Sequence, residues 1–189
     1  MTSFVGIANI ALINLGETRI TSLDDQQKKA VLCKERLSDI IDAVLRAHPW
    51  KCAKTRAVLP LHADVPPYEY SAQFMLPANP YCLRVLDIEN YTDKWEIEGR
   101  FILANLGAPM RIKFIKRITD PNEFDALCVQ AIAARLSSVL AMPITQSQSH
   151  VDLMWKMYKE KLMEARAINA QEGGAQEELS ADQWINSRA

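Results

Sequence analysis

The sequence predicts an α+β protein: a four-helix bundle core with an inserted small antiparallel β lobe and an extended C-terminal arm. In the first 50 residues, and again after residue 119, apolar residues recur at three- and four-residue steps, as in amphipathic helices. Between these parts the pattern changes to short alternating runs broken by prolines, as in strands. We therefore expect one helical half at residues 1–50, the β lobe at 51–118, the second half of the same bundle at 119–172 and the arm at 173–189.

Two helices are expected in the first half. Ser3 is a suitable N-cap for the first helix, and Gly16 stands where a left-handed residue would end it. Ser22 or Asp24 then caps a longer second helix. That helix ends before Pro49, because proline has no backbone N–H and disfavours the helical conformation in the residue before it.

The stretch RAHPWKCAKTR, at residues 46–56, holds a histidine, a tryptophan, a cysteine and four basic side chains. We interpret it as a helix end, where His48 meets the negative end of the helix dipole and Trp50 is a large apolar anchor for the strand that follows. The alternative is a catalytic pair of Cys52 and His48. Neighbours in sequence seldom supply the geometry of such a pair, so the structural interpretation is favoured.

The β lobe is expected to contain short strands joined by turns. A glycine between two strand-like runs predicts a hairpin turn at Glu98-Gly99, and NLGAP, at 105–109, predicts a second turn. The expected strands cover residues 53–61, 82–90, 94–99, 100–105 and 110–118.

Two further helices are expected in the second half, each with a polar cap and a breaking residue. Apolar residues in each recur at helical spacing. For the third helix, the cap is Thr119 or Asp120 and the breaking residue is Pro143. For the fourth helix, the cap is Ser147 or Ser149, and the pair Gly173-Gly174 ends it.

The composition gives little support for an enzyme. The 22 basic and 23 acidic residues give a net charge of −1, so the chain as a whole has no charge preference for nucleic acid or membrane. The four cysteines and three histidines are scattered without a CxxC pair, which predicts no metal site and favours buried apolar cysteines. No glycine-rich phosphate loop and no hydrolase or protease motif occurs. We predict no catalytic residue, no cofactor and, since the apolar N-terminal run is short, no membrane segment.

One local basic stretch, MRIKFIKRI at residues 110–118, has a wet and a dry face at strand spacing. Its basic residues are Arg111, Lys113, Lys116 and Arg117. They form either an ordinary solvated face or a surface that contacts the phosphates of passing DNA without reading its sequence.

Six segments in order resemble the tail tubular protein A family, the adaptor ring below the portal of short-tailed bacteriophages. They are IALINLGETRITSLDD, DAVLRAHPWKCAKTRAVLP, FMLPANPYCLRVL, WEIEGRFILAN, FDALCVQAIAARLSSVLAMPIT and DQWINSRA, and together they span nearly the whole chain. The resemblance implies a structural virion protein that is made in the host cytoplasm. It also implies a ring of about twelve copies between the portal and the tail nozzle (a tail tubular protein B-like partner), with DNA passing through its bore.

The family offers no catalytic residues. It implies that the C-terminal arm contacts the portal or a neighbouring subunit, with Trp184, Ile185 and Arg188 as candidate anchors; a solvated tail is the alternative from composition. Two rival functions remain: a head-completion or connector protein of a long-tailed phage or prophage, and a virion-associated cell-wall hydrolase. The hydrolase requires a cleft with a carboxyl group of raised pKa.

Overall fold

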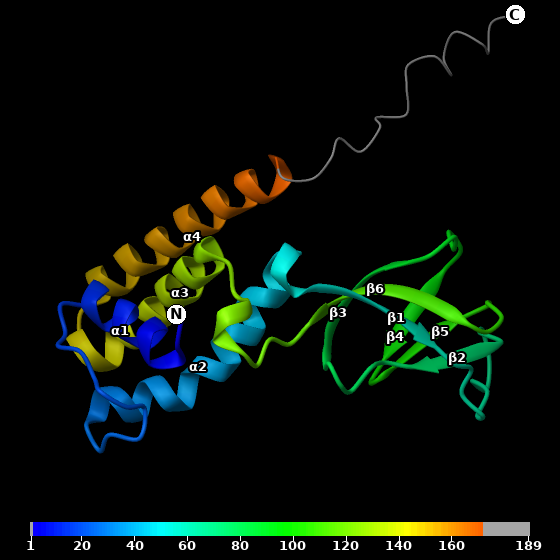
Figure 1. The fold of residues 1–189 in the computed structure, drawn as a ribbon, viewed down its shortest axis with the longest axis horizontal. Coiled ribbons are helices and arrows are strands. Elements are labelled where there is room, and N and C mark those ends of the chain that lie inside the picture. The colour runs from blue at the N-terminus through cyan, green and yellow to red at the C-terminus, as the bar shows by residue number, and fades with distance from the viewer. Residues whose placement is uncertain (1, 172–189) are drawn as a thin grey trace, which may run out of the picture.

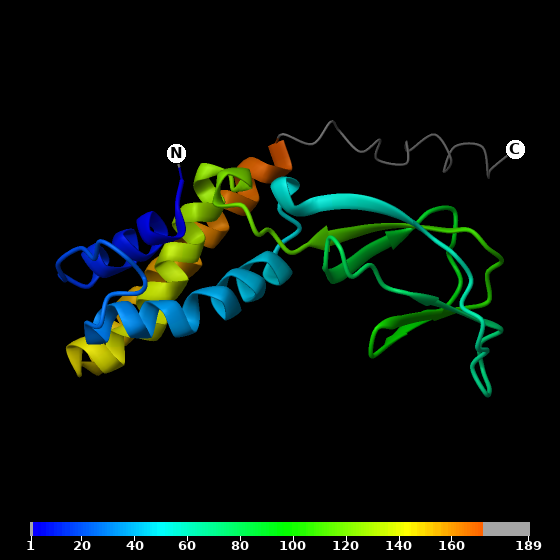
Figure 2. The same ribbon diagram turned by 60° about the horizontal axis from the view of Figure 1, so that its bottom comes forward.

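In the structure, a computed structural model that describes residues 2–171, the chain forms a helical lobe and a β lobe (Figure 1). The view in Figure 2 separates the same two lobes. The helices are α1 (Phe4–Asn14), α2 (Lys28–Ala47), α3 (Ala126–Thr145) and α4 (Gln148–Gln171). The strands are β1 (Lys54–Leu59), β2 (Ala72–Met75), β3 (Cys82–Ile88), β4 (Trp95–Glu98), β5 (Phe101–Ala104) and β6 (Met110–Lys116). Two short 3-10 turns, η1 (Lys51–Ala53) and η2 (Pro121–Glu123), lie where the chain crosses between the lobes.

The expectation of a four-helix bundle core is wrong, although the protein is α+β. In a bundle each helix would contact two neighbours around a common axis. Here α3 is the centre: α1, α2 and α4 each pack mainly against it, while α1 and α2 touch only lightly. The reason is the composition of α3, in which the four consecutive residues 131–134 are all buried. A helix that is apolar on every side is surrounded rather than placed at one corner of a bundle.

Helix α3 is also the one helix within residues 2–171 that is long and apolar enough to cross a membrane. Most of it is buried inside the helical lobe, and a core helix passes the same test of length and composition. It is therefore weak evidence for a membrane span.

The ends of α1 are as predicted, whereas those of α2 and α3 differ. The Ser3 hydroxyl accepts from the Gly6 N–H at 2.9 Å, and Gly16 has φ +76 beyond the end of α1. Helix α2 begins at Lys28 and not beside Ser22, because the Asp25 carboxylate accepts from the backbone N–H groups of residues 21 and 22 and holds a turn. Helix α3 does not stop at Pro143, which lies in its last turn; Gln146, at φ 53, ends it.

The expected start of the third helix at residue 120 is only the turn η2, and α3 begins at Ala126. Asp125 is its N-cap, since its Oδ1 accepts from the Cys128 N–H at 2.7 Å. We expect Asp125→Ala to lower the free energy of unfolding by about 1 kcal/mol, because a backbone donor loses its partner. Urea unfolding measures this, with Asp125→Asn as the matched control that retains a capping oxygen. Equal losses in both variants would contradict the capping role.

The β lobe consists of two three-stranded antiparallel sheets. Sheet A has the order β1-β6-β3, and sheet B has the order β2-β5-β4. The predicted hairpin is present as β4 and β5, whereas β2 was not predicted. The two sheets share one hydrophobic core, in which Phe74 from β2, Ile102 from β5 and Phe114 from β6 are nearly inaccessible to solvent. On the opposite, outer face of sheet A, Arg56, Val58 and Arg111 are exposed, whereas Ile115 at the end nearest the helices is buried in the core of the helical lobe.

Candidate functional site

The segment 46–56 is a joint between the lobes. Trp50 is completely buried, and its Nε1 donates to the Val44 carbonyl at 2.9 Å. Two more carbonyls of the last turn of α2 accept from guanidinium groups: the Arg46 carbonyl from Arg84 on β3, and the Ala47 carbonyl from Arg166 on α4, both at 3.2 Å. The end of α2, which would otherwise leave these acceptors unpaired, is thus tied to both lobes.

Cys52 has another cysteine as its neighbour. A hydrogen bond with the Cys128 thiol, with a further one from the backbone of Asp125, lowers the pKa of Cys52. The pKa of Cys128 is raised by the same contact and by burial. The groups that shift the two pKa values are the paired thiols, burial and Asp125. Both sulfurs belong to the packing between η1 and the start of α3.

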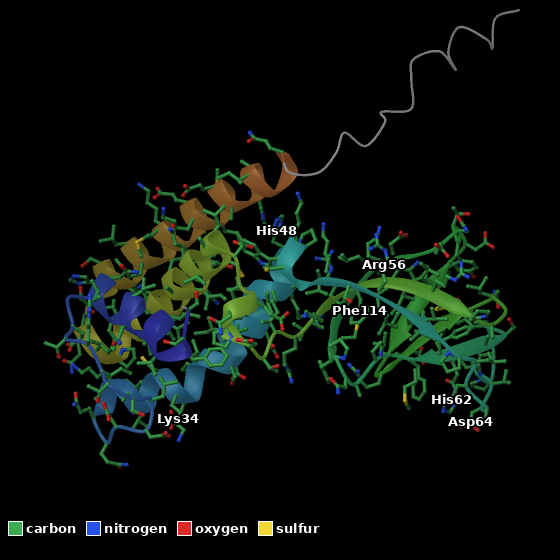
Figure 3. The ribbon with its side chains drawn as sticks, viewed as in Figure 1. Lys34, His48, Arg56, His62, Asp64 and Phe114 are labelled. Atoms are coloured by element: carbon green, nitrogen blue, oxygen red, sulfur yellow. The ribbon has the colours of Figure 1, made fainter. Side chains whose placement is uncertain are left out.

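His48 is half-buried at the same joint, and its ring lies edge-on to Trp50 at 5.0 Å (Figure 3). Burial lowers the pKa of His48 below its usual 6.5, and the charges of Arg166 and Lys54 add to this, while Asp125 opposes it. The unfolded chain therefore binds a proton at higher pH than the folded protein does. The contribution of neutral His48 to the free energy of unfolding is fully present above about pH 6.5. It is lost as the pH falls below that value toward the lower pKa of the folded protein.

We accordingly expect wild-type protein to resist urea better at pH 7.5 than at pH 5.5, and His48→Asn to reduce this difference. The control is His150→Asn at the exposed start of α4, which should keep the wild-type pH dependence. If His48→Asn shows the full wild-type difference between the two pH values, the depressed pKa of His48 does not contribute to stability.

Two of the predicted basic residues of β6, Arg111 and Lys113, have acidic partners on β3 or directly after it. Arg111 Nη1 lies 2.9 Å from an Oε2 of Glu89, and Lys113 Nζ lies 3.8 Å from Oδ2 of Asp87. Both pairs are exposed or half-exposed, so each contributes little to stability. Their geometry is that of a solvated strand face in which part of the positive charge is compensated.

The other two predicted residues serve as links between elements. Lys116 pairs with Glu123 of η2. Arg117 Nε lies 3.0 Å from both carboxylate oxygens of Asp42 on α2, and the Arg117 guanidinium lies 4.4 Å from the ring centre of Tyr81. These contacts give Lys116 and Arg117 structural roles and place them apart from the outer face of sheet A.

A larger set of charges on that outer face was missed. Strand register places Lys54 and Arg84 in one cross-strand row, Arg56, Lys113 and Asp87 in the next, and Arg111 beside Val58 in the third. Glu89, which follows β3, pairs with Arg111. We call this surface the basic face: its members are Lys54, Arg56, Val58, Arg84, Asp87, Glu89, Arg111 and Lys113.

Five cations and two carboxylates give the basic face a net charge of +3, and part of it surrounds a hollow of about 400 Å³. The excess lies along β1, where Arg56 is exposed and forms no ion pair with any residue in the range 2–171 (Figure 3). The sequence signal was present in KTRAVL, where Lys54 and Arg56 alternate with smaller residues in a predicted strand.

A second surface is the loop between β1 and β2, at the end of the β lobe farthest from the helices, where Figure 3 shows His62 and Asp64. Its exposed apolar side chains are Leu61 (52% exposed), Val65 (65%) and Tyr68 (78%). The loop is attached to β2 by a hydrogen bond from the His62 N–H to the Gln73 carbonyl at 3.0 Å. We call residues 60–71 the tip loop.

A third surface lies on α1 at the opposite end of the molecule (Figure 1). Ile10 and Ile13 are 39% and 47% exposed beside a hollow of about 370 Å³ that also reaches Val129 of α3. We call Ile10, Ile13 and this hollow the α1 surface. Within residues 2–171, both side chains leave part of their apolar area accessible to solvent.

Within residues 2–171 no three His, Cys, Asp or Glu side chains are placed to hold a metal ion. Hydrogen bonds lower the pKa values of the Asp25 and Asp120 carboxyl groups, the reverse of what a general acid needs. The predicted anchors Trp184, Ile185 and Arg188 lie outside the described residues.

Comparison with known proteins adds no family. No protein-family model matches the chain, and no curated protein matches it.

Proposed function

We propose that the protein is a structural virion protein: a head-to-tail adaptor that forms a ring between the portal and the tail nozzle of a short-tailed bacteriophage. As the resemblance to the tail tubular protein A family implies, the ring would contain about twelve copies and surround the path of the ejected DNA. The proposal includes no catalytic step and no cofactor. Its location would be the head–tail junction of the virion.

The observation that carries the proposal is the presence of two unlike apolar surfaces at opposite ends of one elongated subunit (Figure 1). The tip loop exposes Leu61, Val65 and Tyr68, and the α1 surface exposes Ile10 and Ile13. A subunit that joins two different rings needs two separate and different contact surfaces. Large apolar and aromatic side chains are the usual energetic centres of such contacts.

The tip loop is also suited to binding without a large loss of entropy. It contains Pro60, Pro66 and Pro67, which restrict the backbone before any partner is bound. A loop that is already restricted loses less freedom on association, so more of the contact energy appears as affinity.

A connector of a long-tailed phage or prophage is the second candidate, because it would need the same two-ended subunit. The two differ in the tail-side partner: a nozzle protein in one case and a tail-completion protein in the other. Testing both tail-side proteins encoded by the same genome separates them.

The proposal is tested by mass photometry of the purified protein mixed separately with the portal and with the tail-side protein of the same genome. The wild-type protein should add about twelve copies to the portal. Two double variants are compared: Tyr68→Ser with Val65→Ser in the tip loop, and Ile10→Ser with Ile13→Ser on the α1 surface. Each should abolish binding to one partner and leave binding to the other unchanged. Met163→Ser, which removes an exposed side chain from α4, is the matched control and should keep both.

Loss of both partners in every variant would indicate general damage, which circular dichroism would detect. Retention of both partners by folded variants of both surfaces would contradict the proposal.

A further inference from the structure

We propose that neighbouring copies of this chain join by β-strand addition, with the β1 edge of one copy against the β4 edge of the next. This contact rests on the proposed ring, because it names the surfaces through which the copies of that ring meet. Both are edge strands: β1 ends the order β1-β6-β3 of sheet A, and β4 ends the order β2-β5-β4 of sheet B. One side of each backbone therefore has no strand partner within residues 2–171, and such an edge is a template for pairing with another chain.

The other two sheet edges are partly occupied by the chain itself. On β3, the Leu83 carbonyl accepts from the Arg46 guanidinium at the end of α2. On β2, the Gln73 carbonyl accepts from the His62 N–H at 3.0 Å. Of the four edges of the two sheets, β1 and β4 are therefore the ones better suited to a second copy.

The β1 and β4 edges carry opposite charges at the same spacing. On β1, Lys54 and Arg56 are exposed, two residues apart on one face of the strand. On β4, Glu96 and Glu98 are exposed with the same spacing. Lys94 lies 3.4 Å from Glu96 and compensates part of this charge. Alternate residues of a strand are about 6.6 Å apart, so both cations of β1 can face both carboxylates of β4 at once.

This charge pattern fixes the register of the added strand. When each cation faces a carboxylate, Thr55 of one copy lies opposite Ile97 of the next, whether the two strands run parallel or antiparallel. Thr55 is half-buried and Ile97 is 44% exposed. Successive side chains of a strand point to opposite faces, so these two meet on the face away from the charges. Their contact would bury apolar surface that the single copy leaves exposed.

The same charges disfavour a two-fold dimer. Pairing β1 with β1 would place cations opposite cations, and pairing β4 with β4 would place carboxylates opposite carboxylates, which is destabilising. The favoured contact is therefore head-to-tail, and repeated head-to-tail contacts close into a ring when the rotation between copies allows it. Neither edge includes the tip loop or the α1 surface, so both remain available to the partner rings.

Disulfide trapping tests the contact on the full-length protein. A first chain carries Thr55→Cys and a second carries Ile97→Cys, so the charged residues stay in place. Directly opposite residues of neighbouring strands have Cα atoms about 4.5–5.5 Å apart, a distance that a disulfide can bridge. After treatment with oxidised glutathione, the mixture should contain about tenfold more covalent dimer than either chain alone. Met75→Cys, at an exposed position on the β2 edge, is the control and should not trap the first chain.

Charge reversal provides the matched comparison. Lys54→Glu with Arg56→Glu in the first chain should lower the dimer yield about tenfold, because like charges then face one another. Glu96→Lys with Glu98→Lys in the second chain should lower it similarly when the first chain is unreversed. Combining the two reversed chains should restore the yield, and this rescue would also show that both reversed chains are folded.

The trapping is carried out on the protein alone at high concentration and on the protein mixed with the portal. Equal trapping by Met75→Cys, or a yield that charge reversal does not change, would overturn the β1–β4 contact. A layer of copies on the portal without the cross-link from Thr55→Cys to Ile97→Cys would contradict this contact alone. Cross-linked copies that add no layer to the portal would contradict the adaptor role alone, and the absence of both would contradict both.

Discussion

Trp50→Ala is expected to be the most destabilising of the substitutions considered, with a loss of about 3–5 kcal/mol in the free energy of unfolding. Trp50 is completely buried in the core of the helical lobe, and its removal leaves a cavity between the end of α2 and η1. The Val44 carbonyl also loses its donor. Since domains of this size are stable by only about 5–15 kcal/mol, urea unfolding should show a midpoint shifted far below that of wild type.

Trp50→Phe separates the two contributions. It retains most of the apolar volume but cannot donate a hydrogen bond, so the loss should be roughly half that of Trp50→Ala. Tyr68→Ala on the exposed tip loop is the control for an aromatic residue without burial and should change stability little. A stability of Trp50→Ala within about 1 kcal/mol of wild type would contradict its role as the anchor of the joint.

Arg100→Met is expected to have the second largest effect on stability, about 2–3 kcal/mol. The Arg100 guanidinium donates to the carbonyls of Cys82 at 3.0 Å and of Leu76 and Pro77, and it stacks on the Tyr81 ring at 4.1 Å. Methionine fills similar space but cannot donate to any of the three carbonyls. The Pro77 carbonyl keeps the Cys82 N–H as a donor at 3.1 Å, and the loss of a donor at a partly buried acceptor is costly.

Arg100→Lys provides the control. A lysine keeps the charge, but its compact ammonium cannot reach three carbonyls with one planar fork, so it should recover only part of the loss. Thermal unfolding of the two variants measures the difference. If Arg100→Met unfolds at the wild-type temperature, the guanidinium does not hold β3 and β5 together.

Local patterns in the sequence predicted the elements more reliably than their packing. The alternation of apolar and basic residues in MRIKFIK predicted β6, and Met110, Ile112 and Phe114 are buried as expected. Gly99, between two strand-like runs, predicted the hairpin that β4 and β5 form. The error lay in α3, whose apolar residues were interpreted as a single face at helical spacing, although residues 131–134 are all buried. Small side chains allow three helices to approach from different sides, and this follows from the surroundings of α3 more than from its own periodicity.

The candidate surfaces were predictable only in part. Arg111 and Lys113 stand out in one strand, whereas Arg84 joins them only because β3 pairs with β6. Pairing between distant strands is not encoded in any short stretch. Likewise, the acidic partners Asp42 and Glu123 of the residues expected to contact DNA come from other elements. The order of the matching segments suggested a ring adaptor, and the two apolar ends of the subunit are compatible with that role.

The central claim is that copies of this chain form a ring on the portal of the same virus. Electron microscopy of the portal mixed with an excess of the protein tests it most directly. The account predicts an added layer of density with rotational symmetry and a central opening on one end of the portal. Portal particles with no added layer, under conditions where both proteins are folded, would contradict it.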